Sequence, residues 1–203
     1  MSNKQSSATN QTKKAREEWI LGKIWRRLMH YYHQWFCRQN YIFRHEGPFN
    51  PENRTDCTFA SYESFDNLPE EIKADIYAGT DGSRLETDKQ ELGENATLWV
   101  AFVDGRVATT AFTRKGKYFR RWFLDLRPED VIVFRLNTKP EFRGRGLAPS
   151  LIRHVLNSIT NLSEHAYIDC RTYNKPSKRC IEKAGFKCVA VKKKIKREWA
   201  LYD

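Results

Sequence analysis

The chain has 203 residues, of which 40% are hydrophobic and 30% charged, and its formal net charge is +11. This length and composition suit one soluble globular domain plus an extension. No apolar stretch reaches the roughly 18 residues of a membrane-spanning helix, and the polar N-terminus does not resemble a secretory signal. The five cysteines lack C-x-x-C spacing, which argues against a disulfide framework and a zinc site. We therefore expect a cytoplasmic protein without a bound metal.

The excess positive charge lies at the two ends of the chain. Residues 1–45 hold nine Lys and Arg against two acidic residues, residues 187–203 hold six against two, and residues 46–186 are balanced. Basic ends can bind nucleic acid, anionic lipid or an acidic partner, but such runs most often form solvated faces. We do not expect nucleic acid as a partner.

The N-terminal part of the chain divides into a tail and a helix. Residues 1–12 are polar without apolar periodicity, which predicts a disordered tail. In residues 13–38, apolar side chains recur at three- and four-residue steps, as in an amphipathic helix. Its aromatic and basic mixture is typical of a membrane-surface helix, although the same stripe also suits packing on the domain or on a second copy in a homodimer. The packing interpretation is favoured because it is the commoner use of this pattern.

Residues 39–203 have the pattern of a single domain of mixed strands and helices. Asp104-Gly105 between two apolar runs is the signal of a hairpin with a type I′ turn. Residues 79–94 are polar and contain glycine, which predicts a loop able to vary with substrate. We predict strands at 40–45, 97–103, 106–114, 118–126, 131–138, 166–173, 187–196 and 198–202, and helices at 68–77, 147–161 and 177–184.

The most informative stretch is Pro140–Ser150, where a predicted strand leads through a glycine turn into a helix. The first amides of a helix lack intrahelical acceptors and lie at the positive end of its dipole, so they can bind a phosphate. Gly144 and Gly146 let the backbone approach the ligand, and Arg143 and Arg145 add forked cationic donors. The spacing is neither G-x-x-x-x-G-K-[ST] nor G-x-G-x-x-G.

A second block follows about thirty residues later and runs from Asn174 to Phe186. Together the two blocks resemble the GNAT superfamily of acyl-coenzyme A dependent N-acyltransferases. The first signature of that family is Arg or Gln, two residues, Gly, one residue, then Gly or Ala. Its second signature is an Asn after a strand, a Ser three residues later, and a short helix that ends in Gly-Phe. The matching positions are Arg143, Gly146 and Ala148 in the first block and Asn174, Ser177, Gly185 and Phe186 in the second.

The resemblance implies an α+β fold, in which a central, mostly antiparallel and splayed mixed sheet is flanked by helices. It also implies acetyl-CoA, or another acyl-CoA, as co-substrate, with its pantetheine arm between the strands at 131–138 and 166–173. The amine acceptor would attack the thioester directly. The positions implied to bind the coenzyme are Leu136, Thr138, Arg143, Gly144, Arg145, Gly146, Leu147, Ala148, Asn174 and Ser177.

The catalytic side chains are less well defined by the sequence. Family members often have a Tyr seven residues after the Asn of the second block, where it protonates the leaving thiolate, but this chain has Ile181. Tyr173, Ser177 and Cys180 are alternatives for that role, although Ser177 is also placed to cap the short helix. The candidate bases are Glu129 and Asp130 before the central strand, and Asp169 within the next strand. We regard His154, on the helix behind the glycine turn, as a packing residue.

The resemblance implies an N-acetyltransferase, and we expect it to act on a small amine, such as an amino sugar, an amino acid derivative or a polyamine. One alternative is a protein N-acetyltransferase, in which 13–38 and 79–94 would help to form a peptide groove. Another is a catalytically weak CoA-binding module that docks to membrane or nucleic acid through its basic ends. The absence of the family's Tyr slightly favours this last alternative.

Overall fold

The computed structural model describes residues 25, 28, 32, 39–46, 56–78, 82–159, 165–193 and 200–201. The predicted tail at 1–12 lies outside the described residues, as does most of the predicted helix at 13–38. Trp25, Leu28 and Tyr32 are described, and each has helical backbone and an exposed side chain. None of the described helices combines the length and the apolar character needed to cross a lipid bilayer.

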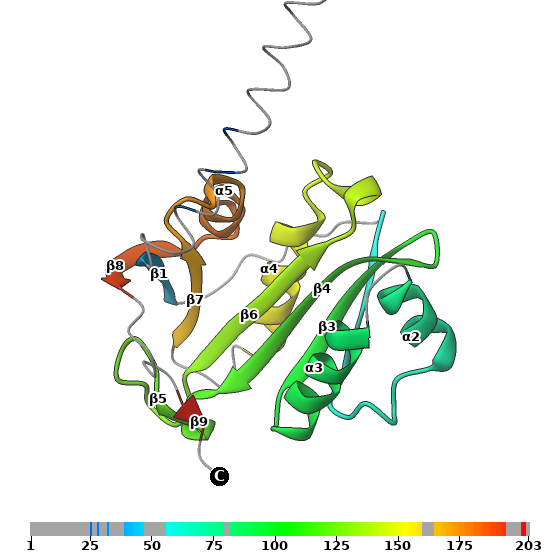
Figure 1. Ribbon diagram of the computed structural model, residues 1–203, viewed down its shortest axis with the longest axis horizontal. Coiled ribbons are helices and arrows are strands. Elements are labelled where there is room, and N and C mark those ends of the chain that lie inside the picture. The colour runs from blue at the N-terminus through cyan, green and yellow to red at the C-terminus, as the bar shows by residue number, and fades with distance from the viewer. Residues whose placement is uncertain are drawn as a thin grey trace, which may run out of the picture. The chain divides into compact units, whose positions relative to one another are not determined.

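Seven of the described strands form one sheet in the order β2-β3-β4-β6-β7-β1-β8 (Figure 1). Neighbouring strands are antiparallel except β6 and β7, which are parallel. This confirms the predicted α+β fold with a mostly antiparallel mixed sheet. The strands of the sheet are β1 (Gln39–Glu46), β2 (Thr58–Tyr62), β3 (Thr97–Val103), β4 (Arg106–Lys115), β6 (Val131–Thr138), β7 (His165–Arg171) and β8 (Lys187–Lys193).

The first strand of the domain lies inside the sheet rather than at its edge. β1 pairs with β7 on one side and with β8 on the other, and it is antiparallel to both. Its residue Asn40 lies opposite Arg171, the last residue of β7. β1 therefore brings a side chain from the beginning of the domain to the carboxyl end of β7.

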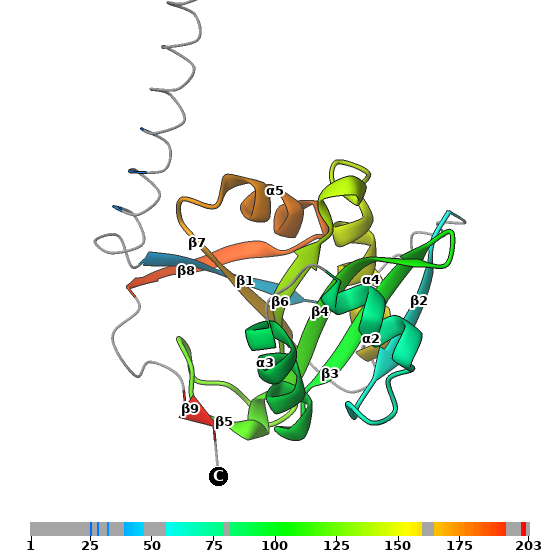
Figure 2. The same ribbon diagram turned by 45° about the vertical axis from the view of Figure 1, so that its right-hand side comes forward.

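Helices cover both faces of the sheet (Figure 2). α2 (Glu70–Tyr77) and α3 (Gly82–Gly93) lie on one face, and α4 (Leu147–Ile159) lies on the other. β3 shows why the sequence permits this arrangement. Its alternate residues Leu98 and Val100 pack in the cluster with α2 and α3, whereas Trp99 and Ala101 pack in the cluster with α4. A strand that is buried on both faces reads as a continuous apolar run rather than as an alternating one.

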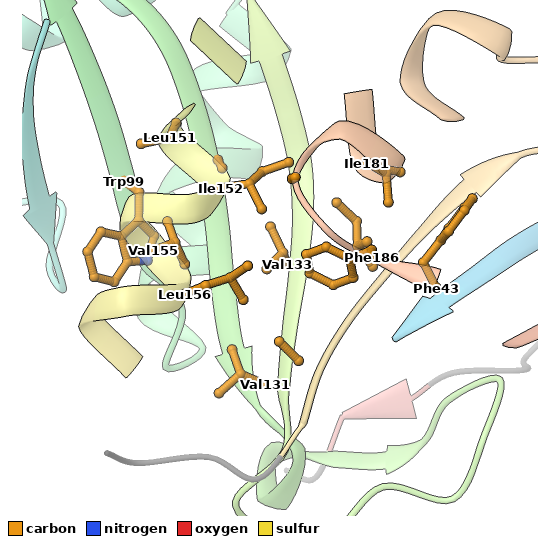
Figure 3. Packing of buried hydrophobic residues seen from close by; sticks show 14 of the residues in the cluster. Phe43, Trp99, Val131, Val133, Leu151, Ile152, Val155, Leu156, Ile181 and Phe186 are labelled. Carbon is orange, nitrogen blue, oxygen red and sulfur yellow. The ribbon is translucent and has the colours of Figure 1, made fainter. Parts of the chain in front are cut away.

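The larger core lies between the sheet, α4 and α5 (Lys175–Lys183). Figure 3 shows Leu151, Ile152 and Val155 of α4 directed at the sheet, with Phe186 beside Val133. Ile181 is fully buried in the same cluster. The position seven residues after Asn174, where the resemblance implied a proton donor, is therefore a core position here.

Three element predictions differ from the structure. Residues 82–93, expected in a loop, form helix α3. Its buried residues are Asp88 and Leu92, so it has no apolar stripe. The ion pair between Asp88 and Arg135 of β6 helps to hold it on the domain. The strand expected at 118–126 is confined to β5 (Phe119–Arg121), which pairs with β9 (Ala200–Leu201). β2 was not predicted.

Candidate functional site

The sheet opens where β6 and β7 separate. These strands pair only at Val131–Val133 with Ala166–Ile168, and they diverge toward their carboxyl ends (Figure 1). A pocket of about 460 Å³ lies in this region. Its lining comes from β6 and β7, the start of α5, Asn40 of β1, and a second wall formed by α3, β4 and residues 119–123. The predicted splay of the sheet is thus present, and a pocket lies within it.

A bulge in β6 lies at the edge of this pocket. Phe134 lies opposite Phe112 and Asn137 lies opposite Thr110, so Arg135 and Leu136 together face a single residue of β4. Arg135 has a φ of 53°, in the left-handed region that costs a non-glycine residue about 1–2 kcal/mol. Bulges interrupt the ladder and leave an extra residue unpaired. β6 therefore has main-chain groups beside the pocket that are not needed for hydrogen bonds within the sheet.

The bulge is held from outside the strand by a buried carboxylate. The guanidinium of Arg135 is paired with the carboxylate of Asp88 in α3, which also accepts a 3.3 Å hydrogen bond from the hydroxyl of Tyr77. Asp88 is 1% exposed. Burial and the neighbouring Asp88 charge both raise the pKa of Tyr77, so this hydroxyl stays protonated and continues to donate. The predicted substrate loop is in fact the helix that fixes the bulge.

The glycine turn after β6 has the geometry that the sequence predicts. Gly144 and Gly146 have φ values of 80° and 76°, and α4 begins directly afterwards at Leu147. A Cβ at Gly144 would meet no atom within 4 Å, so glycine is needed there for its backbone angle rather than for space. The Nε of Arg143 donates to the carbonyl oxygen of Thr138 at 3.1 Å, which ties the turn to the end of β6.

The start of α5 forms the opposite rim. Asn174 is the N-cap of this helix, and its Oδ1 accepts a 3.2 Å hydrogen bond from the amide of Ser177. The prediction that Ser177 caps the helix is therefore wrong, and the three-residue spacing of Asn and Ser is the spacing of an N-cap and its N3 amide. Both residues line the pocket. Gly185 follows the helix with a φ of 97°, which explains the Gly-Phe ending of this block.

The sequence-derived candidates for the catalytic side chains are distributed unevenly around the pocket. Asp169 lines it, and its Oδ2 accepts a hydrogen bond from the side-chain amide of Asn40. Arg171 donates to the other end of the same amide at 3.3 Å. Tyr173 lies in the turn between β7 and α5, and Glu129 is exposed in the turn before β6; neither lines this pocket.

Three other titratable residues considered in the sequence analysis have packing or turn roles. Cys180 packs against the core, and burial raises the pKa of its thiol to about 11. Asp130 is 1% exposed and accepts the amide of Arg127 at 2.8 Å, as a turn residue does. His154 stacks on Phe59 with ring centres 4.3 Å apart, and burial lowers its pKa. The interpretation of His154 as a packing residue agrees with these contacts.

The sequence analysis missed four charged residues that line the pocket: Glu91, Arg114, Arg135 and Arg171. Arg114 of β4 is fully buried, and its Nη2 donates to the carboxylate of Glu91 in α3 at 2.8 Å. Burial raises the pKa of Glu91, although the guanidinium opposes this shift. An arginine within an apolar strand was a visible signal of a buried ion pair. Its partner could not be recognised while residues 79–94 were read as a loop.

Comparison with known sequences agrees with the motifs. Residues 121–199 match the family model described as FR47-like protein. This region includes β6, the glycine turn, β7 and α5. No curated protein sequence matches the chain.

Solved structures of GNAT proteins have a similar fold. A GNAT-family protein from Novosphingobium aromaticivorans matches with a TM-score of 0.52 and 21% identity, over 76% of this chain and 61% of its own. A GNAT-family acetyltransferase from Colwellia psychrerythraea matches with a TM-score of 0.54 and 14% identity, over 75% and 53%. A tandem GNAT protein from the clavulanic acid biosynthesis pathway matches with a TM-score of 0.53 and 14% identity, over 74% and 50%.

The chain spans about half to three fifths of the length of these structural relatives. The similarity therefore concerns the fold of the region that contains the pocket. Together with the FR47-like match over residues 121–199, it shows the GNAT fold and agrees with the resemblance seen in the sequence.

Proposed function

We propose that this chain, which has the GNAT fold, is an N-acetyltransferase that transfers the acetyl group of acetyl-CoA to a primary amine of a small molecule. The observation that carries the proposal is the junction of three features in one place. These are a splayed pair of strands, a glycine turn that opens a helix, and a pocket between them. A thioester co-substrate with a pyrophosphate at one end and an extended arm would fit all three.

The side chains present fit the coenzyme. The first amides of α4 and the cationic groups of Arg143 and Arg145 would bind the pyrophosphate. Main-chain groups at Leu136 and Thr138 would hold the arm, and the capped start of α5 with Asn174 and Ser177 would lie beside it. Since the carbonyl of Thr138 already accepts from Arg143, we expect the arm to use the other main-chain groups of this segment.

When bound, the coenzyme supplies an acyl group on a good leaving group. The protein has to orient the amine, stabilise the developing oxyanion and accept a proton. The β6 bulge offers main-chain groups for the oxyanion, and Asp169 is our candidate for the proton acceptor, directly or through one water. A thiolate with a pKa of about 8.5 leaves without a dedicated acid, which agrees with the burial of Ile181 in the core.

The substrate is proposed to be small because of the size of the pocket. Its volume of about 460 Å³ lies within the range of small-molecule sites, roughly 300–1,000 Å³. A protein substrate and a CoA-binding module without turnover are the alternatives. A cytoplasmic location, membrane contact through 13–38 and homodimer formation remain predictions.

The test is calorimetric titration with acetyl-CoA, followed by thiol release with amino sugars, amino acids, polyamines and basic peptides. We expect one saturable site and thiol release with a small amine. Release with peptides alone would favour the protein acetyltransferase. Binding without release from any acceptor would favour the binding module, and absence of binding would refute the proposal.

A charge reversal in the glycine turn tests the pyrophosphate site. Arg143→Glu should weaken acetyl-CoA binding by about tenfold, because it removes a charge-assisted donor and adds repulsion at an exposed position where solvent screens both. Calorimetry of the variant measures this. Arg120→Glu makes the same charge change in β5, before the amino end of β6, and should bind normally. Equal affinities in the two variants would place the pyrophosphate elsewhere.

A further inference from the structure

Asn40 is a buried polar residue of the pocket that belongs to neither of the two sequence blocks. It lies near the beginning of β1, and it is 5% exposed. Buried polar side chains in folded proteins are held by hydrogen bonds. Asn40 has two charged partners, Asp169 and Arg171 of β7, which line the same pocket.

The two contacts use opposite ends of the side-chain amide. The Nη1 of Arg171 donates to Oδ1 of Asn40 at 3.3 Å, and Nδ2 of Asn40 donates to Oδ2 of Asp169. A guanidinium only donates and an ionised carboxylate only accepts, so the amide fits between them in one orientation. The opposite orientation would place the amide oxygen against the carboxylate and the NH₂ group against the guanidinium. Arg171 therefore determines which end of Asn40 contacts Asp169.

The register of the strands explains why these three side chains meet. Asp169 and Arg171 are two positions apart in β7, so they share one face of the sheet. Asn40 lies opposite Arg171 and Ile42 lies opposite Asp169, which makes Asn40 the diagonal neighbour of Asp169. Diagonal side chains of an antiparallel pair are within reach of each other. All three groups are thus carried by paired strands and not by a loop.

The hydrogen bond from Asn40 has two effects on the carboxylate. A donor to the ionised form of a carboxylate favours that form over the protonated one. The contact also fixes one of the two oxygen atoms, so the carboxylate cannot turn about its last bond without losing it. A group that accepts a proton has to be both ionised and correctly oriented. The contact with Asn40 meets both requirements at Asp169.

We infer that Asn40 is a positioning residue, which orients the carboxylate of Asp169 and keeps it ionised, and that Arg171 acts through Asn40 by fixing its amide. The inference rests on the proposed function, in which Asp169 accepts the proton of the amine. Asn40 lies 129 positions before Asp169 in the chain, so the motifs around β6 and α5 do not include it.

The first experiment removes the amide and follows the pH dependence of kcat. Asn40→Leu keeps the size of the side chain and removes the donor, so the acidic limb should move to higher pH by about one unit, the value of one hydrogen bond to a charged group. Asn40→Asp also adds a like charge and should move the limb further. In both variants kcat should recover as the pH rises, and the affinity for acetyl-CoA should be kept. Asn40→Asp decides alone should Asn40→Leu fail to fold.

Gln39→Leu is the matched control, because it replaces an amide by leucine at the neighbouring, exposed position on the other face of β1. It should leave the acidic limb unchanged. The acceptor is the same in all these proteins, so its own titration cancels. Other charges near Asp169 are also unchanged in Asn40→Leu. The charged and titratable groups are Glu91, Arg114, Arg135, Cys170 and Arg171 around the pocket, Arg44, Tyr167 and Lys192 on the neighbouring strands, and Lys178 of α5 near Cys170.

A double-mutant cycle tests whether Arg171 acts through Asn40. Arg171→Met should lower kcat by about 2- to 10-fold in the otherwise unmodified protein, the value of an ordinary hydrogen bond. In the Asn40→Leu protein it should have less than about a twofold effect, because the group through which it acts is absent. Arg171→Lys keeps a cationic donor and should restore most of the rate. Additive losses would contradict a role through Asn40.

Carboxyl carbon NMR separates this inference from the proposed function. The signal of Asp169, assigned by its absence in Asp169→Asn, should titrate at higher pH in both Asn40 variants. A shifted titration supports the role of Asn40 even if no acceptor releases thiol, a result that would refute only the acyltransferase. An unchanged titration in both variants, or a shifted titration with an unshifted acidic limb of kcat, overturns the inference.

Discussion

Replacing Asp169 with asparagine is expected to lower kcat for acetyl transfer by about 100-fold or more, the usual contribution of a general base. The substitution keeps the size of the side chain and an oxygen that can accept the hydrogen bond from Asn40. The pocket should therefore keep its shape and its affinity for acetyl-CoA. Steady-state thiol release and calorimetry measure the two quantities separately.

The pH dependence distinguishes proton transfer from a structural role of Asp169. A base must be ionised to act, so kcat of the unmodified protein should fall as the pH drops through the pKa of that base. The asparagine variant should lack this acidic limb and retain a low, flatter rate. A variant that is slow but keeps the same acidic limb would show that another group accepts the proton.

Glu129→Gln is the matched control, because it also replaces a carboxylate by its amide. Glu129 was a candidate from its place before the central strand, but it is exposed in a turn and does not line the pocket. We expect unchanged kcat and KM. A large loss in this variant together with a normal Asp169→Asn protein would reverse the assignment.

The sequence predicted best the elements whose signals are local. The bounds expected for β3 and β6 agree with the structure, because both are apolar runs that end at clear turn residues. The positive φ angles of Gly144 and Gly146 follow from the same kind of signal. The α5 block was recognised by its Asn and Ser, although the capping roles were assigned to the wrong residue of the two.

The parts that the sequence did not predict depend on distant partners. α3 is polar, and its buried Asp88 is stabilised by Arg135, which lies 47 positions later. Asn40 contacts Asp169 only because β1 lies between β7 and β8, a position that nothing in residues 39–46 specifies. The pocket wall with Glu91 and Arg114 depends on the placement of α3. The features that could not be predicted therefore depend on non-local ion pairs and on the order of the strands.

The largest effect on stability is expected from Gly116→Ala. A Cβ at Gly116 would lie 2.1 Å from the carbonyl oxygen of Arg127, a main-chain atom that cannot rotate away. The amide of Gly116 also donates to the carbonyl of Asp130 at 2.6 Å, which holds the two segments together. Glycine is required here for space, because its φ is not in the left-handed region.

We expect Gly116→Ala to lower the free energy of unfolding by about 3 kcal/mol, the upper range for overpacking, and Tm by roughly 6–12 °C. Gly93→Ala is the control, because a Cβ there meets no atom within 4 Å and alanine favours the helix. It should be as stable as the unmodified protein or slightly more so. Equal stability of the two variants would contradict the close approach. Phe119 and Trp122 line the pocket and lie in the segment between Gly116 and Arg127. A folded Gly116→Ala protein should therefore also bind acceptors more weakly, while its affinity for acetyl-CoA is kept.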